Sequence, residues 1–463
     1  MSLSSLANLY CPSFLRPALN RVETSSITRR MARGAFWSLV GAVITRGLGL
    51  VSGILAARIL GKEGYGELGI INNTIGLFGS VAGFGLGLTA TKYVAEFRES
   101  DPLKAGRILT MSAIVYWITG AAAAILLFIL APWLARETLA APHLASGLRI
   151  GALLLALGAI NGGQSGALAG FEAFKRLTFL SVCTGLVHFP SVILGCWWFG
   201  LEGALWGFVI TSAVGVVITR WAIIAEARRF RVPLWTSRWT AELPVLWKFS
   251  LPTLAAGLLV TPVVWFCQTL LARQPGGYEG LAEYTVGASW RGLVQYLPGL
   301  LLSAYLPVAA SLNTQSAARR RKLMWTTAAG SVGITFLTAL IVFAASPWIL
   351  RSYGAGFATA TWVFAFMLLT GVVDAANGVL MQTLLASGRA YLRLVSNSTW
   401  CLLVTGFSLW AVPRYGALGL AGALCLGQAA HLCIQIPLAR LAASGQGAHQ
   451  EISACPSPSP LQP

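Results

Sequence analysis

"ILTMSAIVYWITGAAAAILLFILAPW", residues 108–133, contains no charged side chain. A helix needs about 20 predominantly apolar residues to cross the hydrocarbon core of a bilayer. Comparable runs begin near residues 35, 67, 150, 177, 203, 249, 283, 323, 357, 393 and 416, which makes twelve in all. The composition agrees, since 56% of the residues are hydrophobic, 10% are charged and the mean hydropathy is +0.70. The sequence therefore predicts an all-α integral membrane protein with about twelve transmembrane helices.

The end of this apolar run is repeated later in the chain. "APWLAR" (131–136) returns as "SPWILR" (346–351). Four more pairs have nearly the same spacing, with offsets of 216 or 217: "GYGE" (64–67) and "GLAE" (280–283), "AING" (159–162) and "AANG" (375–378), "LAGFEAFKRL" (168–177) and "LASGRAYLRL" (385–394), "FGLEG" (199–203) and "YGALG" (415–419). This spacing predicts two lobes of six helices each. Six is an even number, so the repeats are parallel, as in transporters that bind substrate between their halves.

The predicted lobes define five parts of the chain. A polar N-terminal extension covers residues 1–30, and Met31 is an alternative start. The first lobe covers 31–225, a cytoplasmic linker 226–248 and the second lobe 249–440. The tail, 441–463, is rich in Pro and Ser and is predicted to be disordered.

The formal net charge of +18 comes from basic residues that lie mostly on one side of the predicted spans. Clusters occur before the first span, between the lobes and before the ninth span, for example Arg29, Arg30 and Arg33, then Arg228, Arg229 and Arg231, then Arg319, Arg320, Arg321 and Lys322. Basic loops stay in the cytoplasm, so both termini are predicted to be cytoplasmic. This distribution explains the charge as membrane topology, and no nucleic-acid partner is expected.

Motifs for metal, nucleotide and catalytic chemistry are absent from the sequence. The eight cysteines form no CxxC pair, and the four histidines have no metal-ligand or catalytic spacing. His188 and His431, within predicted spans, are expected to pack rather than carry protons. No GxxxxGK[ST] loop is present, so ATP hydrolysis by that route is excluded. We expect no metal, no cofactor and no enzymatic activity.

Three ionisable residues fall inside predicted spans. Arg46 lies eleven residues into the first span, Arg291 about eight residues into the eighth, and Asp374 within the tenth. Each costs about 2.5–3.5 kcal/mol at the bilayer centre, so such residues face water or a partner. Two arginines with one acid favour an anionic substrate, because guanidinium binds phosphate oxygens in pairs. The alternatives are a structural pair of Asp374 with either arginine, or an Arg291 side chain that extends to the outer interface. What resets an empty carrier stays open between the membrane potential, a proton on Asp374 and a counter-ion.

Four further polar residues occupy equivalent places in the two lobes. Asn161 and Asn377 precede glycines in the fourth and tenth spans. They are expected either to line a sugar path or to bridge helices. Glu67 and Glu283 follow outer turns at helix starts. Either they complement the helix dipole or they bind a coupling proton or cation.

Three motifs resemble a known family: "ARILGKEGYGELGI" (57–70), "GFEAFKR" (170–176) and "GLEGALWG" (200–207). They are similar to those of Wzx-type oligosaccharide flippases, the polysaccharide transporter branch of the MOP superfamily, over roughly residues 31–440. The resemblance implies a V-shaped bundle in the bacterial inner membrane. It also implies that the bundle moves undecaprenyl-diphosphate-linked oligosaccharide to the periplasmic leaflet for lipopolysaccharide or exopolysaccharide synthesis, with a polymerase or ligase as partner.

"TRGLGL" (45–50) is similar to the first helix of the lipid II flippase branch, whose arginine lines a cationic cavity. Arg46 matches that arginine. Ser52 stands where that branch has a second arginine, and its members carry fourteen spans rather than twelve.

The hypothesis is therefore a flippase that works by alternating access, with Arg46 and Arg291 holding the diphosphate. One alternative is a multidrug or cation exporter of the same superfamily, which would require a surplus of acidic residues. Another is a membrane-bound polymerase or acyltransferase, which would require long outer loops.

Overall fold

The computed structural model describes residues 26–83, 85–250, 259–299, 301–302, 305, 317–386 and 390–444. Within these ranges the regular structure is helical throughout, and seven helices are long and apolar enough to cross a membrane. The predicted all-α membrane fold is confirmed. The predicted N-terminal extension (1–30) and tail (441–463) fall almost entirely outside the described residues.

The helices divide between the two lobes as follows. The first lobe holds α3 (Ser26–Ala82), α4 (Leu86–Phe97), α5 (Pro102–Trp133), α6 (Ala145–Gly170) and α7 (Phe174–Arg229), with short turns at Leu134–Thr138 and Pro142–Leu144. Trp239–Glu242 and Leu246–Ser250 are short helical turns between the lobes. The second lobe holds α9 (Val260–Ala272), α10 (Gly277–Val294), α12 (Ala317–Ala344), α13 (Ser346–Tyr353), a turn at Ala355–Ala360, α14 (Thr361–Ala386) and α15 (Ala390–Ser444).

Three of the apolar helices fold back on themselves at a glycine. Gly61, Gly200 and Gly416 have φ values of +74°, +57° and +54°, a region that other residues rarely adopt. Gly195 and Gly203 lie in contact, although a straight helix would separate them by about 12 Å. α3, α7 and α15 therefore provide two crossings each, so the seven apolar helices make ten. With α9 and α10, the described chain has the predicted twelve.

The internal repeat is visible in the backbone and in one hydrogen bond. Gly200 (φ 57°, ψ −134°) and Gly416 (φ 54°, ψ −128°), 216 positions apart, have almost the same conformation. Asn161 Nδ2 donates to the Ser212 carbonyl oxygen at 3.0 Å, and the equivalent Asn377 Nδ2 donates to that of Gln428 at 3.1 Å. The two lobes are therefore parallel copies of one six-helix unit, as predicted.

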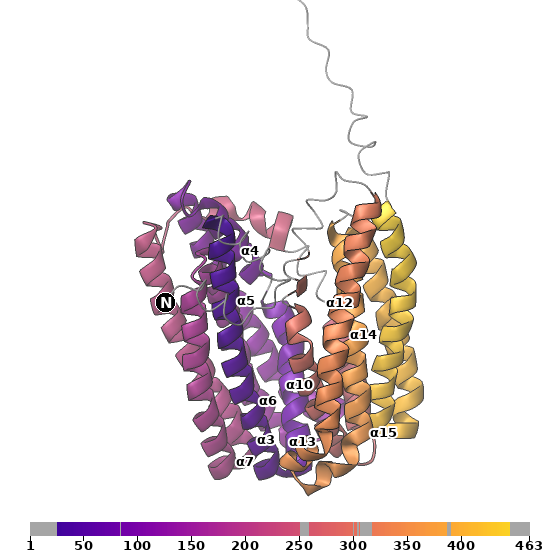
Figure 1. The fold of residues 1–463 in the computed structure, drawn as a ribbon. Helices are drawn as coiled ribbons and strands as arrows, with labels where there is room; N and C mark the ends of the chain where they lie inside the picture. The colour runs from indigo at the N-terminus through magenta and orange to yellow at the C-terminus, as the bar shows by residue number, and fades with distance from the viewer. Residues whose placement is uncertain are drawn as a thin grey trace, which may run out of the picture.

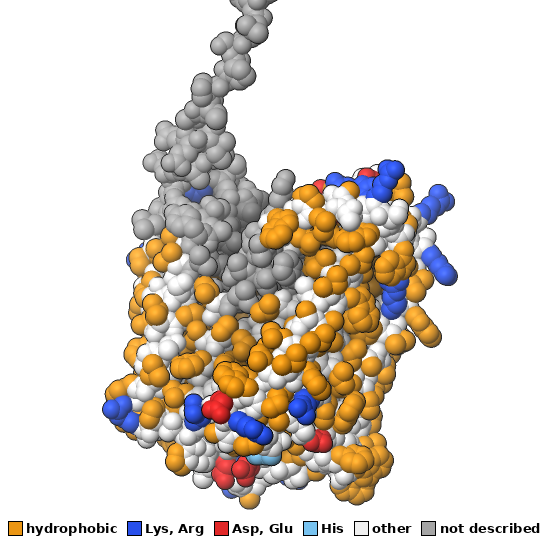
Figure 2. Space-filling view, turned by 180° about the vertical axis from the view of Figure 1, so that it is seen from behind, with side chains coloured by type: hydrophobic (Ala, Val, Ile, Leu, Met, Phe, Trp, Pro, Cys, Tyr) orange, Lys and Arg blue, Asp and Glu red, His pale blue; other side chains and the backbone are white. Residues whose placement is uncertain are grey.

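The lobes stand side by side and meet at one end (Figure 1). The end with Gly61, Gly200 and Gly416 is termed the turn end, and the opposite end, with residues 230–250, the linker end. In the space-filling view, apolar side chains cover the middle of the molecule, whereas charged side chains gather toward its two ends (Figure 2). A band of this kind fits the hydrocarbon layer of a membrane.

The segment after α7 packs on the first lobe at the linker end. Gly106 of α5 has no room for a side chain beside Pro233, and Thr110 Oγ1 donates to the Leu234 carbonyl at 3.2 Å. Arg107 Nε pairs with Glu242 Oε1 at 2.9 Å. Helix α7 continues to residue 229, so the predicted linker (226–248) begins within this helix. These contacts attach the described part of the linker to the first lobe.

Candidate functional site between the lobes

The three intramembrane charges lie at one depth. Arg46 is fifteen residues from Gly61, Arg291 fourteen from Gly277, and Asp374 thirteen from Thr361. At 1.5 Å per residue, all three are about 20 Å from the turn end. Arg291 is thus deeper than the predicted eight residues, because α10 begins before the apolar run does. The level of these three residues is termed the cationic level.

Asp374 lies beside Arg291. The shortest nitrogen–oxygen distance, from Arg291 Nη1 to Asp374 Oδ2, is 3.8 Å, and Gln295 Nε2 donates to the same oxygen at 2.8 Å. Arg291 and Gln295 are four residues apart, so α10 presents both on one face. Of the two pairings that the sequence left open, the structure contains the one with Arg291. It lies within the second lobe and offsets part of the charge of Arg291.

Arg46 reaches from the first lobe to the second. Its Nη1 donates to the Gly292 carbonyl oxygen at 3.2 Å, and its guanidinium carbon is 4.7 Å from the centre of the Tyr296 ring. The side chain is exposed. No ion pair joins Arg46 to an acid in the described part of the chain, so the cationic level keeps one unneutralised positive charge. An anionic ligand binds a guanidinium group more strongly than a carbonyl oxygen or a ring face does, so it could replace the Gly292 carbonyl and the Tyr296 ring as partners of Arg46.

Asn161 and Asn377 connect helices within their lobes. Asn161 binds the last helix of the first lobe, and Asn377 binds the Gln428 carbonyl and also Gln428 Oε1 at 3.0 Å. These bonds fit the helix-bridging interpretation, because both amide nitrogens are occupied within one lobe. The Asn377 Oδ1 atom is buried and has no hydrogen-bond partner among the described residues.

Glu67 and Glu283, although equivalent in sequence, have different partners at the turn end. Glu67 Oε1 lies 2.5 Å from His143 Nε2, within the first lobe. Glu283 Oε1 lies 2.8 Å from Lys62 Nζ, across the lobe boundary, and Glu279 Oε2 lies 3.5 Å from the same nitrogen. Glu283 therefore holds the lobes together.

Other contacts close the turn end. Tyr278 Oη donates to the Leu139 carbonyl at 2.7 Å, and the Tyr65 ring centre is 6.2 Å from that of Tyr353. Arg58 Nε donates to the carbonyl of Ser352. The Lys62 pairs and these three contacts are termed the turn-end latch. Deeper contacts, such as Trp265 Nε1 to Thr74 Oγ1 at 2.9 Å, continue it toward the cationic level.

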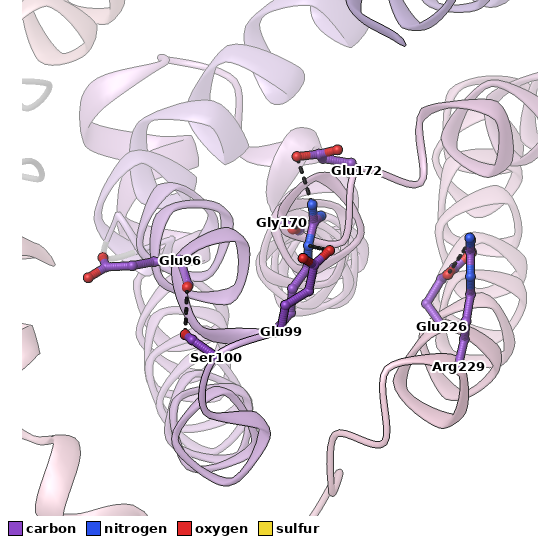
Figure 3. A network of polar contacts seen from close by, with 8 residues as sticks. Glu96, Glu99, Ser100, Gly170, Glu172, Glu226 and Arg229 are labelled. Atoms are coloured by element: carbon purple, nitrogen blue, oxygen red, sulfur yellow. Dashed lines mark hydrogen bonds and ion pairs between the residues drawn. The ribbon is translucent and has the colours of Figure 1, made fainter. Parts of the chain in front are cut away.

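The linker end of the first lobe carries a separate charged network (Figure 3). Arg98, 7% exposed, pairs with Glu172 at 2.8 Å and donates to the Gly170 carbonyl at 2.9 Å. Glu226 is 3.0 Å from Arg176 and 3.7 Å from Arg229. The "GFEAFKR" motif thus joins the ends of α4, α6 and α7. Because these charges are paired, the network holds helix ends and leaves Arg46 as the distinctive cation.

Sequence reasoning missed three residues at these sites. Gln295 could have been found, since it lies one turn after Arg291. The pairing of Lys62 depends on how the lobes meet, which the sequence does not predict. Tyr296 carries no signal in the sequence. Among the described residues, no group of three or more His, Cys, Asp or Glu side chains could hold a metal ion.

Fold and site together define a class: a duplicated, two-lobed helical membrane protein with surplus positive charge between its lobes. The sequence profile of the polysaccharide biosynthesis protein family matches residues 31–313. The chain belongs to this family, which confirms the family predicted from the motifs.

Individual proteins of known function or structure resemble the chain over most of its length. It is 24% identical over 412 residues to the "Lipid III flippase" of Escherichia coli (strain K12), covering 85% of this chain and 94% of that one. Its fold matches an inward-facing multidrug resistance MATE family transporter of the MOP superfamily, with TM-score 0.72 and 15% identity, over 88% of this chain and 98% of that one. It also matches "Lipid II flippase MurJ, inward closed conformation", with TM-score 0.67 and 14% identity, over 88% and 89%.

Proposed function

We propose that this protein is a flippase for a lipid-linked, negatively charged saccharide in the bacterial inner membrane. It carries the headgroup from the cytoplasmic to the periplasmic leaflet for surface polysaccharide synthesis. The observation that carries the proposal is Arg46, a cation between the lobes that no acid in the described chain neutralises. The family and the flippase relatives support the same assignment.

The charge balance favours a polyprenyl diphosphate as the anchor of that saccharide. Arg46 and Arg291 face a single acid, Asp374. A diphosphate offers several oxygens to planar guanidinium groups and supplies the missing negative charge. An exporter of organic cations would require the opposite surplus, and the likeness to a multidrug transporter concerns the fold alone. The outer loops at 134–144 and 345–360 are short and largely helical, which offers little room for a polymerase or acyltransferase site.

The position of the lobe contacts suggests the state of the transport cycle. The distribution of basic residues favours a turn end in the periplasm and both termini in the cytoplasm. With the turn-end latch closed, the cationic level is shut off from the periplasm. Rocking one lobe against the other would break the latch and expose the headgroup on the other side.

The proposed cycle begins when the headgroup enters between the lobes and the polyprenyl chain stays in lipid. Arg46 exchanges the Gly292 carbonyl for phosphate oxygens, and Arg291 supplies the second cation. Neutralising the phosphates reduces the cost of moving them through the hydrocarbon layer. A polymerase or ligase that uses the delivered saccharide is the partner we propose.

The test is translocation in proteoliposomes that contain a fluorescent undecaprenyl-diphosphate oligosaccharide and a membrane-impermeant quencher. We expect Arg46→Ala to abolish protein-dependent movement and Arg46→Lys to restore part of it, because a lysine keeps the charge without the planar donor pair. Arg136→Ala, which removes an exposed arginine at the turn end, is the matched control and should flip normally. Wild-type rates in Arg46→Ala would contradict the proposed role of Arg46.

A further inference from the structure

The second lobe contains a buried polar cluster that is separate from Arg46, Arg291 and Asp374. It consists of Ser396, His431 and Gln435, from the two arms of α15, which are 0%, 5% and 0% exposed. Ser396 Oγ lies 2.7 Å from His431 Nε2, and Gln435 Nε2 lies 3.2 Å from Ser396 Oγ and 3.1 Å from His431 Nε2. An ionisable side chain buried within a membrane bundle usually marks a functional site. These three residues are termed the histidine cluster.

A row of polar side chains connects the histidine cluster to the cationic level. Gln428 precedes His431 by one turn of α15 and accepts both hydrogen bonds from Asn377 Nδ2. Asn377 follows Asp374 by one turn of α14, and residues so spaced share a helix face. His431 is fifteen residues from Gly416, about 22 Å from the turn end. The row therefore runs within one lobe at nearly the depth of Arg46.

The first lobe serves as an internal control for what packing requires. With the offset of 217 that relates residues 385–394 to 168–177, the equivalent of Ser396 is Phe179, and with the offset of 216 those of His431 and Gln435 are Gly215 and Thr219. The first lobe nevertheless forms the same hairpin. The six-helix unit therefore packs without the histidine cluster, and the cluster is an addition in the second lobe.

The cluster has hydrogen-bonding capacity that the described chain does not use. His431 Nδ1 and Gln435 Oε1 are both buried and have no partner among the described residues. Imidazole gains a proton within the physiological range, and the charged ring donates from both nitrogens. Rotating the Gln435 amide by half a turn would bring Oε1 to the ring as an acceptor. After that rotation, Ser396 Oγ and Gln435 Oε1 could both accept from a protonated Nε2, whereas Nδ1 has no partner among the described residues.

Few charged groups face the cluster. Along the polar row the acid is Asp374, with Arg291 beside it. Among the described residues, the core beside Leu432 and Ile436 is apolar or neutral, with Met324, Ala328, Val379, Leu380, and Tyr305, which is hydrogen-bonded to Thr383. The charged side chain that follows on α15 is Arg440, which lies over the Trp325 ring. Cys433 of α15 is exposed. A proton on His431 would thus add positive charge to the second lobe. Along the row from Asp374 through Asn377 and Gln428 to His431, the acidic residue is Asp374.

We propose that the histidine cluster is a proton-binding site, and that a proton on His431 changes the balance between two arrangements of the lobes. The inference rests on the proposed function only in treating the protein as a transporter that alternates between states. A ligand shifts such a balance when it binds one state more tightly than the other. The proton is the ligand here, and it would supply the driving force that the cationic level lacks.

The first test needs no substrate. Spin labels at Ser146→Cys and Arg351→Cys, exposed positions at the turn end of either lobe, report the distance between lobes in lipid nanodiscs. Between about pH 4 and pH 8 we expect the ratio of the two lobe arrangements to change by about 5- to 150-fold, mostly in the acid part of this range, because burial disfavours the charged imidazole. His431→Gln should abolish the change. His188→Gln, which removes a first-lobe histidine stacked on Phe208, should retain it.

Ser396→Ala is a second variant in case His431→Gln does not fold. It keeps the imidazole, so the pH response should remain and only its midpoint should move. A pH response that survives in His431→Gln, or none in the wild type, would overturn the proposal. Flipping under an imposed pH gradient separates the two proposals. A His431-dependent distance change without flipping would refute the proposed cargo alone. Flipping with a gradient response that survives in His431→Gln would refute the proton site alone.

Discussion

The turn-end latch gives a quantitative prediction for the balance between lobe arrangements. Lys62 and Glu283 are 18% and 14% exposed and 2.8 Å apart. Exposed pairs contribute less than about 1 kcal/mol, whereas breaking a buried pair costs about 3–5 kcal/mol. This pair is partly buried, and Glu279 shares the same ammonium group. We therefore expect the Lys62 pairs to stabilise the closed turn end by about 1–3 kcal/mol. Lys62→Met should favour the opened arrangement by about 5- to 150-fold.

The labels at residues 146 and 351 measure this shift as a longer distance across the turn end. Glu283→Gln should have a smaller effect than Lys62→Met, because Glu279 remains 3.5 Å from the lysine. The double variant that combines Lys62→Met with Glu283→Gln should open little more than Lys62→Met alone, because Lys62→Met already removes the interaction between the two side chains. Glu137→Gln, an exposed acid at the same end, is the control. A Lys62→Met distance distribution like that of the wild type would refute the assignment of this pair as a latch.

Three further predictions concern stability. Asn377→Ala and Asn161→Ala should each lower the free energy of unfolding by about 0.5–2 kcal/mol. The measurement is the midpoint of thermal unfolding in detergent, which should fall. Unchanged midpoints together with a loss of flipping would favour a sugar-binding role for these residues instead. Gly195→Val should prevent the hairpin of α7 from closing and abolish monodisperse protein in size-exclusion chromatography, whereas Gly158→Ala, which has open space around it, should be tolerated. Arg98→Met should cost about 1–3 kcal/mol, since it leaves the Gly170 carbonyl oxygen without the Arg98 donor, and a normal unfolding midpoint would contradict that.

Most of the fold could be predicted from the sequence because a bilayer imposes a simple length rule on apolar helices. The repeat offsets near 216 also predicted that the lobes are parallel, and Gly200 and Gly416 confirm it in the backbone. The break between α3 and α4 and the early start of α10 were not predicted. Both depend on turns and packing that leave the hydropathy pattern unchanged.

The candidate site was predictable in its residues and only partly in its contacts. Arg46, Arg291 and Asp374 stood out because charge is rare at bilayer depth. The choice of Arg291 as the partner of Asp374 follows from α10 and α14 being neighbours, which spacing along the chain does not encode. The latch between Lys62 and Glu283 depends on how the lobes meet, and the Ser396–His431–Gln435 cluster on which arms of α15 face each other.

We propose that the protein moves an anionic headgroup because positive charge is left uncompensated between its lobes. The most direct measurement compares, in the same proteoliposomes, the translocation of an undecaprenyl-diphosphate oligosaccharide with that of an undecaprenyl-linked saccharide that lacks the phosphates. We expect rapid, Arg46-dependent movement of the diphosphate and none of the neutral lipid. Equal movement of both lipids, or transport of organic cations in place of either, would contradict it.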